Sequence, residues 1–157
     1  MKKSILLILV LVLTWCTAAW ALETNLISVR NDILKNAQEM KGYFTTSRDP
    51  LLLNSIWDSS VMAVSQLDAY FSMLGIVNTI KNEELTADGV KYLLNWLKQI
   101  QETTDMNIRG LEAIKTTTDA RSKVFVLKLK DIFNGLKNKL DVEYVNMTKL
   151  QATLVKQ

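Results

Sequence analysis

The chain has no histidine, one cysteine and one proline among its 157 residues. Without histidine it cannot form a Ser-His-Asp or Cys-His catalytic site, a histidine haem ligand, or most zinc sites of proteins. It also lacks the GxxxxGK[ST] and GxGxxG patterns that bind nucleotide phosphates. These absences argue against an enzyme, and we expect no cofactor and no bound metal.

Proline and glycine are scarce, with one proline and five glycines, so the sequence has few residues suited to turns. Apolar residues after Leu22 recur at spacings of three and four, whereas the alternation typical of strands is absent. This pattern predicts an all-α fold.

The N-terminus has the three parts of a secretory signal peptide. Lys2 and Lys3 precede an unbroken apolar run of nine residues, 5–13, and Ala19 and Ala21 supply small residues at positions −3 and −1 of a cleavage site. The sequence therefore predicts a signal peptide at residues 1–21. The short basic opening favours a bacterial protein that is periplasmic or secreted.

The same segment has two alternative interpretations. Apolar character extends over 18 residues, 5–22, which is just enough to cross a bilayer about 30 Å thick as an uncleaved inner-membrane signal anchor. In that case the two lysines would hold the N-terminus in the cytoplasm and the bundle would face outward. A lipoprotein attached through Cys16 is disfavoured, because Trp15 stands where a small residue is required.

Cleavage after Ala21 would remove the only cysteine together with Lys2 and Lys3, and would lower the net charge from +3 to +1. The remaining 136 residues would then have no disulfide and would be held together by their core. A chain of that length buries enough surface for one domain.

Four amphipathic helices follow, and short connections make consecutive helices antiparallel neighbours. Asp49-Pro50 predicts the start of the second helix, because Asp is a good N-cap and Pro suits the first helical position. The predicted N-caps of the third and fourth helices lie in Thr86-Ala87-Asp88 and at Asp119. The predicted fold is an elongated, up-down-up-down four-helix bundle with helices at about 23–45, 50–81, 87–115 and 120–155. A single bent helix across 116–119 is the alternative for the last two.

Each helix carries an apolar stripe that is expected to face the core. In the second helix the stripe is Leu53, Ile56 or Trp57, Ser60, Val64, Leu67, Phe71 and Leu74. In the fourth it is Phe125, Leu129, Ile132, Leu136, Leu140, Tyr144, Met147, Leu150 and Leu154. No acidic residue lies on any stripe, which argues against a carboxylate metal site. Ser60 and Thr104 do, and we expect them to bond back to their own helices.

The helix rise places aromatic residues in two groups. Tyr43, Phe44, Trp57 and Phe125 fall near one end, and Tyr70, Phe71, Trp96 and Tyr144 fall towards the other. Trp57 and Trp96 are therefore expected not to touch. We interpret these rings as core-filling residues, with a pocket for a small apolar ligand as the alternative.

Charge is unevenly distributed along the chain. Residues 22–120 contain nine basic and thirteen acidic side chains, whereas residues 121–157 contain eight basic and three acidic ones. These lysines form a solvated face that attracts acidic helices, or a docking strip for an acidic protein or an anionic envelope component. The candidate partner-binding residues are Lys123, Lys128, Lys130, Lys137, Lys139 and Lys149. Nucleic acid is disfavoured by the predicted export and the low net charge.

The sequence thus predicts a non-enzymatic envelope protein that acts by binding, as a periplasmic adaptor, a chaperone-like helper or a ligand-sensing bundle. The alternative is a structural or assembly protein that oligomerises as a coiled coil through its long C-terminal helix.

Overall fold

The computed structural model describes residues 25–114 and 119–154, and the predicted signal peptide lies outside them. The described chain is all-α, with four antiparallel helices and a short 3-10 turn, and it contains no strand. The predicted helical bundle is confirmed. Its elements are an N-terminal helix over residues 25–41, η1 (Phe44–Thr46), α2 (Pro50–Thr79), α3 (Glu83–Ala113) and α4 (Ala120–Leu154).

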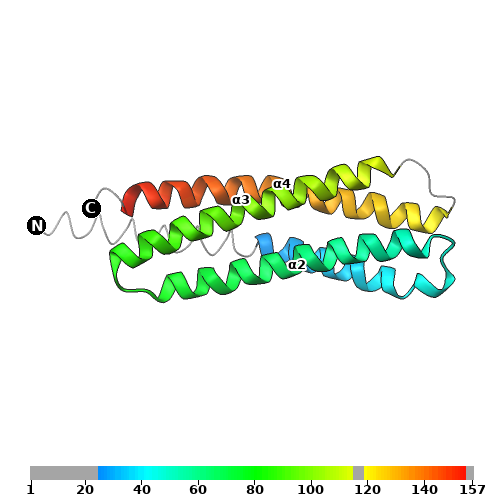
Figure 1. The fold of residues 1–157 in the computed structure, drawn as a ribbon, viewed down its shortest axis with the longest axis horizontal. Coiled ribbons are helices and arrows are strands. Elements are labelled where there is room, and N and C mark those ends of the chain that lie inside the picture. The colour runs from blue at the N-terminus through cyan, green and yellow to red at the C-terminus, as the bar shows by residue number, and fades with distance from the viewer. Residues whose placement is uncertain (1–24, 115–118, 155–157) are drawn as a thin grey trace, which may run out of the picture.

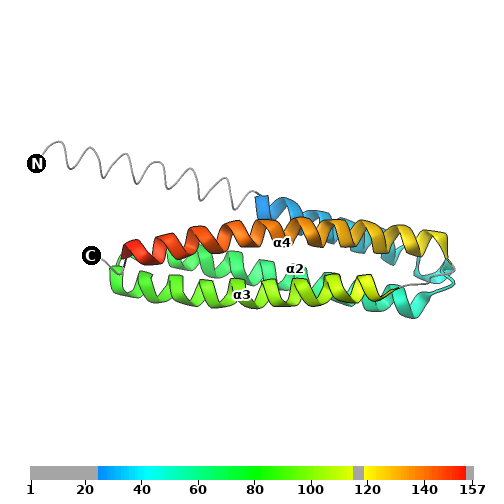
Figure 2. The same cartoon turned by 90° about the horizontal axis from the view of Figure 1, so that it is seen from above.

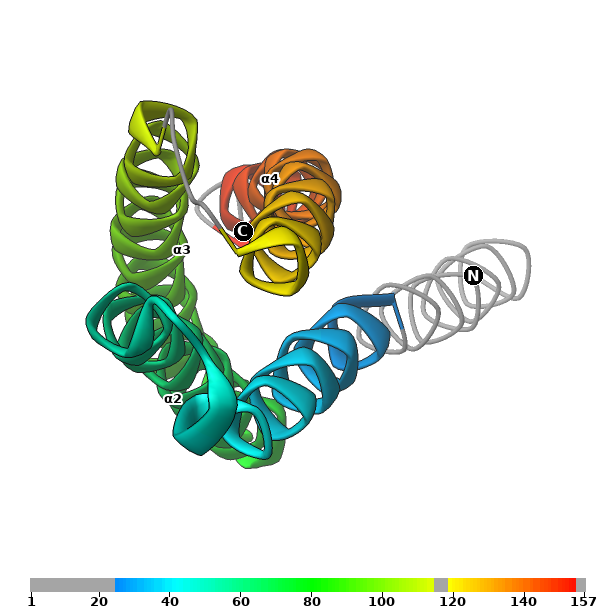
Figure 3. The same ribbon diagram turned by 90° about the vertical axis from the view of Figure 1, so that its right-hand side faces the viewer.

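The helices α2, α3 and α4 run the full length of an elongated bundle (Figure 1). Seen end on, α3 lies next to both α2 and α4, and the N-terminal helix occupies the remaining side between α2 and α4 (Figure 3). The described N-terminal helix covers only the half of the bundle where α2 and α4 begin (Figures 1 and 2). The Lys139 side chain, midway along α4, donates to the Asn25 carbonyl at 3.1 Å. Asn25 is the first described residue of the N-terminal helix, so the described part of this helix begins beside the middle of α4.

The predicted helix starts at residues 50 and 120 agree with the structure, and the predicted ends at residues 23, 115 and 155 lie outside the described residues. The predicted start of α3 at residue 87 is wrong. The helix begins at Glu83, because the Asn82 side chain accepts a hydrogen bond from the Leu85 N–H at 3.1 Å and caps it. The first turns of α3 bring Gly89 against α2, where a Cβ would stand 2.7 Å from a methyl group of Val77. Glycine therefore allows the close approach of these two helices.

The N-terminal helix also differs from its predicted extent. It ends at residue 41 and not at 45, and residues 42–46 form a turn and η1 instead. Helix α2 starts at Pro50 as predicted, since proline has no N–H to lose at the first helical position. Chain reversal therefore takes up more residues at this end of the bundle than the sequence indicated.

The apolar stripes form one continuous core, as predicted, with two local differences. Tyr70 and Phe133 are fully buried, while their neighbours Phe71 and Ile132 are only partly buried. On α4 the buried position next to Tyr144 is Glu143, which is 7% exposed, so the expectation of no acid on a stripe is wrong. The Tyr70 hydroxyl donates to the Glu143 carboxylate at 2.6 Å, and this bond accommodates the acid inside the bundle.

The predicted order of aromatic residues agrees with the contacts. Tyr43 and Phe125 share one end, with ring centres 6.1 Å apart. The Trp96 indole N–H donates to the Gln66 carbonyl at 3.1 Å, nine residues along α2 from Trp57. Nine residues correspond to about 13 Å of helix rise, so the two tryptophans lie at different levels. Ser60 bonds back to the Ile56 carbonyl at 2.9 Å, as expected.

Helix α2 is unusually apolar. Asp58 and Asp68 are its only charged residues, and by length and hydropathy (1.3) it is the one described helix that could cross a membrane. A core helix meets the same criterion, and about a third of the apolar window in α2 is buried inside the bundle. We therefore treat α2 as a bundle helix.

Asp119 ties the loop before α2 to the start of α4. It is 7% exposed, and its carboxylate accepts hydrogen bonds of 2.8–3.2 Å. The donors are Tyr43 Oη, Ser47 Oγ, Ser122 Oγ and the backbone N–H groups of Arg48 and Arg121. Asp119 is therefore both the predicted cap of α4 and a clamp across the end of the bundle.

Burial alone would raise the pKa of Asp119, but the hydrogen bonds from Tyr43, Arg48, Arg121 and Ser122 hold it well below its usual range. The folded pKa thus lies below the unfolded value of about 3.9. The stability that Asp119 contributes is complete above that value and is lost as the pH falls through the folded pKa.

We expect Asp119→Asn to lower the thermal midpoint at neutral pH and to flatten its fall below about pH 4. Melting curves recorded by circular dichroism between neutral pH and pH 2 would measure both effects. The control is Asp131→Asn, an exposed acid on the same helix. If the thermal midpoint of Asp119→Asn fell as steeply below about pH 4 as that of the native chain, this role would be contradicted.

Asn36 is a buried polar residue without hydrogen-bond partners in the described core. It lies on the inner face of the N-terminal helix, it is completely buried, and neither amide atom has a hydrogen-bond partner among the described residues. An unsatisfied buried polar group costs about 1–3 kcal/mol. Asn36 therefore weakens the packing of the N-terminal helix.

Replacing Asn36 with leucine, which has a similar size and no polar atoms, should stabilise the fold by about 1–3 kcal/mol. Urea titration of the native chain and of Asn36→Leu would measure the change. Gln38→Leu, at an exposed position of the same helix, is the matched control and should change stability by less than about 0.5 kcal/mol. Destabilisation by Asn36→Leu would mean that the amide is satisfied in solution.

Candidate functional site

The lysines of α4 were the first candidates for a partner-binding surface. Two of them point to the N-terminal helix: Lys128 forms an ion pair with Glu39 at 2.8 Å, and Lys139 bonds the Asn25 carbonyl. The hydrogen bond from Lys128 lowers the pKa of Glu39. On this side, lysine charge is directed at the protein's own acid and carbonyl groups.

Two more lysines point to α3 on the opposite side of α4. Lys137 pairs with Asp105 at 2.7 Å, and Lys130 pairs with Glu112 at 3.0 Å. The hydrogen bond to Asp105 raises the pKa of Lys137. All four partners are acids or carbonyls of neighbouring helices, as expected for a basic face that attracts acidic ones. Each exposed pair contributes little by itself, about 0–1 kcal/mol.

Lys123 and Lys149 are exposed and form no ion pair within the described residues. They are 26 residues apart, which corresponds to about 39 Å along α4. The lysines of α4 without an acidic partner among the described residues are thus these two, near the ends of the helix, and Lys139 midway along it, whose ammonium donates to the Asn25 carbonyl. A continuous docking strip along α4 stays a prediction, and its strongest points are Lys123 and Lys149.

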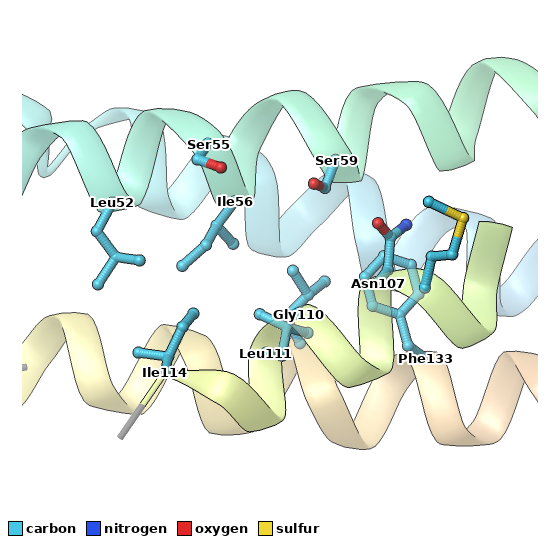
Figure 4. Close-up of a pocket in the computed structure, with 11 residues that line it drawn as sticks. Leu52, Ser55, Ile56, Ser59, Asn107, Gly110, Leu111, Ile114 and Phe133 are labelled. Carbon is cyan, nitrogen blue, oxygen red and sulfur yellow. The ribbon is translucent and has the colours of Figure 1, made fainter. Parts of the chain in front are cut away.

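A cavity of about 210 Å³ opens between α2 and α3. Its lining comes from the first part of α2 and the last part of α3, with Phe133 of α4 next to Asn107 (Figure 4), and it also includes Leu129 of α4. The walls are Leu52, Ser55, Ile56, Ser59, Met106, Asn107, Gly110, Leu111 and Ile114. Seven of the eleven lining residues are therefore apolar, and none is charged.

Three polar side chains of this cavity make no hydrogen bond within the described chain: Ser55 and Ser59, one turn apart on α2, and Asn107 on α3. By contrast, Ser60 and Ser72 of the same helix α2 bond back to their helix carbonyls. The Asn107 amide points towards α2 beside Ser59, and its Nδ2 is buried without a partner (Figure 4). Such uncommitted polar groups at an apolar cavity are typical of ligand sites.

The cavity lies where short residues interrupt its otherwise large wall side chains. A Cβ on Gly110 would meet nothing within 4 Å, so no side chain of the bundle fills the space beside it. Ser55 and Ser59 face it with short side chains from α2. Sequence inspection did not identify this site, although these small and polar residues next to the stripes were a visible signal.

The other candidate positions do not form a comparable site. A hollow of about 380 Å³ between the N-terminal helix and α4 is bordered by Asp32, Asp131, Lys128 and Lys139, which are charges of both signs. Trp57, Trp96 and Tyr144 pack against the core and line neither cavity, as their core-filling interpretation predicted. Within the described residues, no three potential metal ligands come together.

Comparison with known proteins gives no match, whether to a family model, a curated protein or a solved structure. Function must therefore be inferred from the chemistry of this chain's own residues.

Proposed function

We propose that this chain is an exported protein of the bacterial cell envelope that acts by binding and not by catalysis. The observation that carries the binding role is the cavity between α2 and α3, with the buried and unpartnered Nδ2 of Asn107 in its lining. Export is supported by the leader-like residues 1–21 of the sequence. An adaptor, a chaperone-like helper and a ligand-sensing bundle all fit this description.

The chemistry of the cavity favours binding over catalysis. Its lining has no titratable side chain, whereas general acid–base catalysis needs one within hydrogen-bond reach of the reacting group. Ser55 and Ser59 have hydroxyl groups, but no base stands beside them in the lining to activate either as a nucleophile. The Ser55 and Ser59 hydroxyl groups are therefore suited to orient a bound molecule by hydrogen bonds.

The lysines of α4 are proposed as a second contact surface, for an acidic protein or an anionic envelope component. Since four of the six lysines contact groups of neighbouring helices, Lys123 and Lys149 offer the most charge to a partner. Binding there would weaken with added salt, because exposed charges are screened within about 10 Å at 0.1 M salt.

Export predicts that the protein from its native host is found in the periplasm or the medium and begins at Leu22. Mass spectrometry of the fractionated protein would measure this N-terminus. Leu9→Arg, which interrupts the apolar run, should retain the chain in the cytoplasm, whereas the control Leu9→Ile should not. Intact Met1 in a cytoplasmic fraction would overturn export, and intact Met1 in the inner membrane would support the signal anchor.

The alternative is an assembly protein that oligomerises through α4. Exposed aliphatic residues favour it: Val124 and Leu127 near one end of the outer face, and Val142 and Val145 towards the other, each 49–60% exposed. Three exposed polar residues at helical spacing separate these pairs, and they are Asp131, Asn134 and Asn138. A coiled-coil seam needs an uninterrupted apolar stripe, so the outer face is poorly suited to one.

We therefore expect the mature protein to sediment as a monomer at micromolar concentration. Sedimentation velocity would measure its mass, and Val142→Lys with Val145→Lys should leave that mass unchanged. A dimer that these two substitutions dissociate would favour the assembly role over the binding role.

A further inference from the structure

We propose that the cavity between α2 and α3 binds a small, neutral aromatic alcohol of the size of phenol. This inference rests on the proposed binding function and names the chemical class of its ligand. It is carried by the volume of the cavity, by its lack of charge, and by the position of its polar groups.

The volume limits the ligand to about one ring. An apolar cavity of about 150 Å³ lined by Leu, Ile and Phe binds benzene in another protein. The cavity described here measures about 210 Å³, and Leu, Ile and Phe form most of its apolar lining. It therefore has room for a ring with one or two further heavy atoms, and it is too small for most drug-sized ligands, which occupy about 300–1,000 Å³.

The lining indicates a neutral ligand with an apolar body. Leu52, Ile56 and Ile114 gather at one end of the cavity, with Ser55 beside them, and Ser59 and Asn107 lie towards the other end, next to Phe133 (Figure 4). No lining residue carries a charge that could compensate a buried ionic group. A ring would lie among the aliphatic side chains with its polar group towards Ser59 and Asn107.

A hydroxyl group satisfies that polar end best. The Asn107 Nδ2 is a buried donor without a partner, and the Ser59 hydroxyl both donates and accepts. A phenolic hydroxyl can accept from the amide and donate to the serine at the same time. An apolar ring such as toluene offers neither bond, and a carboxylate such as benzoate would be buried with its charge unpaired.

Isothermal titration calorimetry of the mature protein with phenol, toluene and benzoate tests whether phenol binds with the highest affinity of the three. We expect phenol to bind with a Kd of about 1 mM or tighter, a range reached by small ligands that use each atom well. Toluene should bind at least about tenfold more weakly, because it makes neither of the two hydrogen bonds that phenol can make. Benzoate should show no binding. Equal affinity for phenol and benzoate, or no binding of phenol at millimolar concentration, would overturn the proposal.

Glycine substitutions provide a matched pair of variants. Gly110→Leu places a side chain in the cavity, and it should weaken phenol binding at least tenfold. Gly75→Leu makes the same change on α2, where a Cβ also meets nothing within 4 Å and the residue does not line the cavity. Its phenol affinity should be unchanged. Both variants should stay folded, since leucine is a better helix former than glycine. Equal weakening by the two substitutions would contradict a site in this cavity.

A third variant tests the polar end by itself. Asn107→Leu should weaken phenol binding several-fold and leave toluene binding nearly unchanged, because it removes one of the two hydrogen bonds to the phenolic hydroxyl and keeps Ser59. A preference for phenol over toluene as large as in the native chain would contradict the assigned orientation. An exported chain that binds none of the three molecules but co-purifies with an envelope protein would overturn this inference and leave the proposed function intact. Cytoplasmic retention would overturn the function independently.

Discussion

The bundle depends on burying one apolar stripe from each of four helices, and α3 and α4 do this most completely. Leucines and Phe133 interlock between them, and Leu93, Leu97, Leu129 and Leu136 are fully buried. Between α2 and α3 the flanking positions are serines, an asparagine and a glycine, which are too small to close the space. Close packing requires that volumes match across an interface, so the cavity follows directly from these side chains.

The same packing decides what the charges do. Glu39 on the N-terminal helix, and Asp105 and Glu112 on α3, stand beside lysines of α4. Basic residues concentrated on one helix therefore meet acidic residues on its neighbours, which favours this arrangement of helices over others. An excess of lysine in one segment of sequence is thus weak evidence for an external partner when the rest of the chain is acidic.

Periodicity in the sequence was enough to predict the helices, their antiparallel order and most core residues, because these follow from which residues are apolar. It failed where a single side chain decided the outcome. Asn82 starts α3 early by capping it, and Glu143 is buried because Tyr70, 73 residues away, donates to it. The cavity was missed for a related reason: it depends on the combined volumes of side chains from three helices, which no one stripe contains.

Buried polar atoms without partners provide the last constraint on function. In the described chain they occur on Asn36, Gln66 and Asn107. Gln66 and Asn107 both lie at the α2–α3 side, since Gln66 bonds Thr103 of α3 at 3.3 Å and Asn107 lines the cavity. Apolar residues at these positions would give a more stable bundle. Natural proteins depart from the most stable choice chiefly at functional sites, so the interface that α2 and α3 leave open is where this protein's function is best sought.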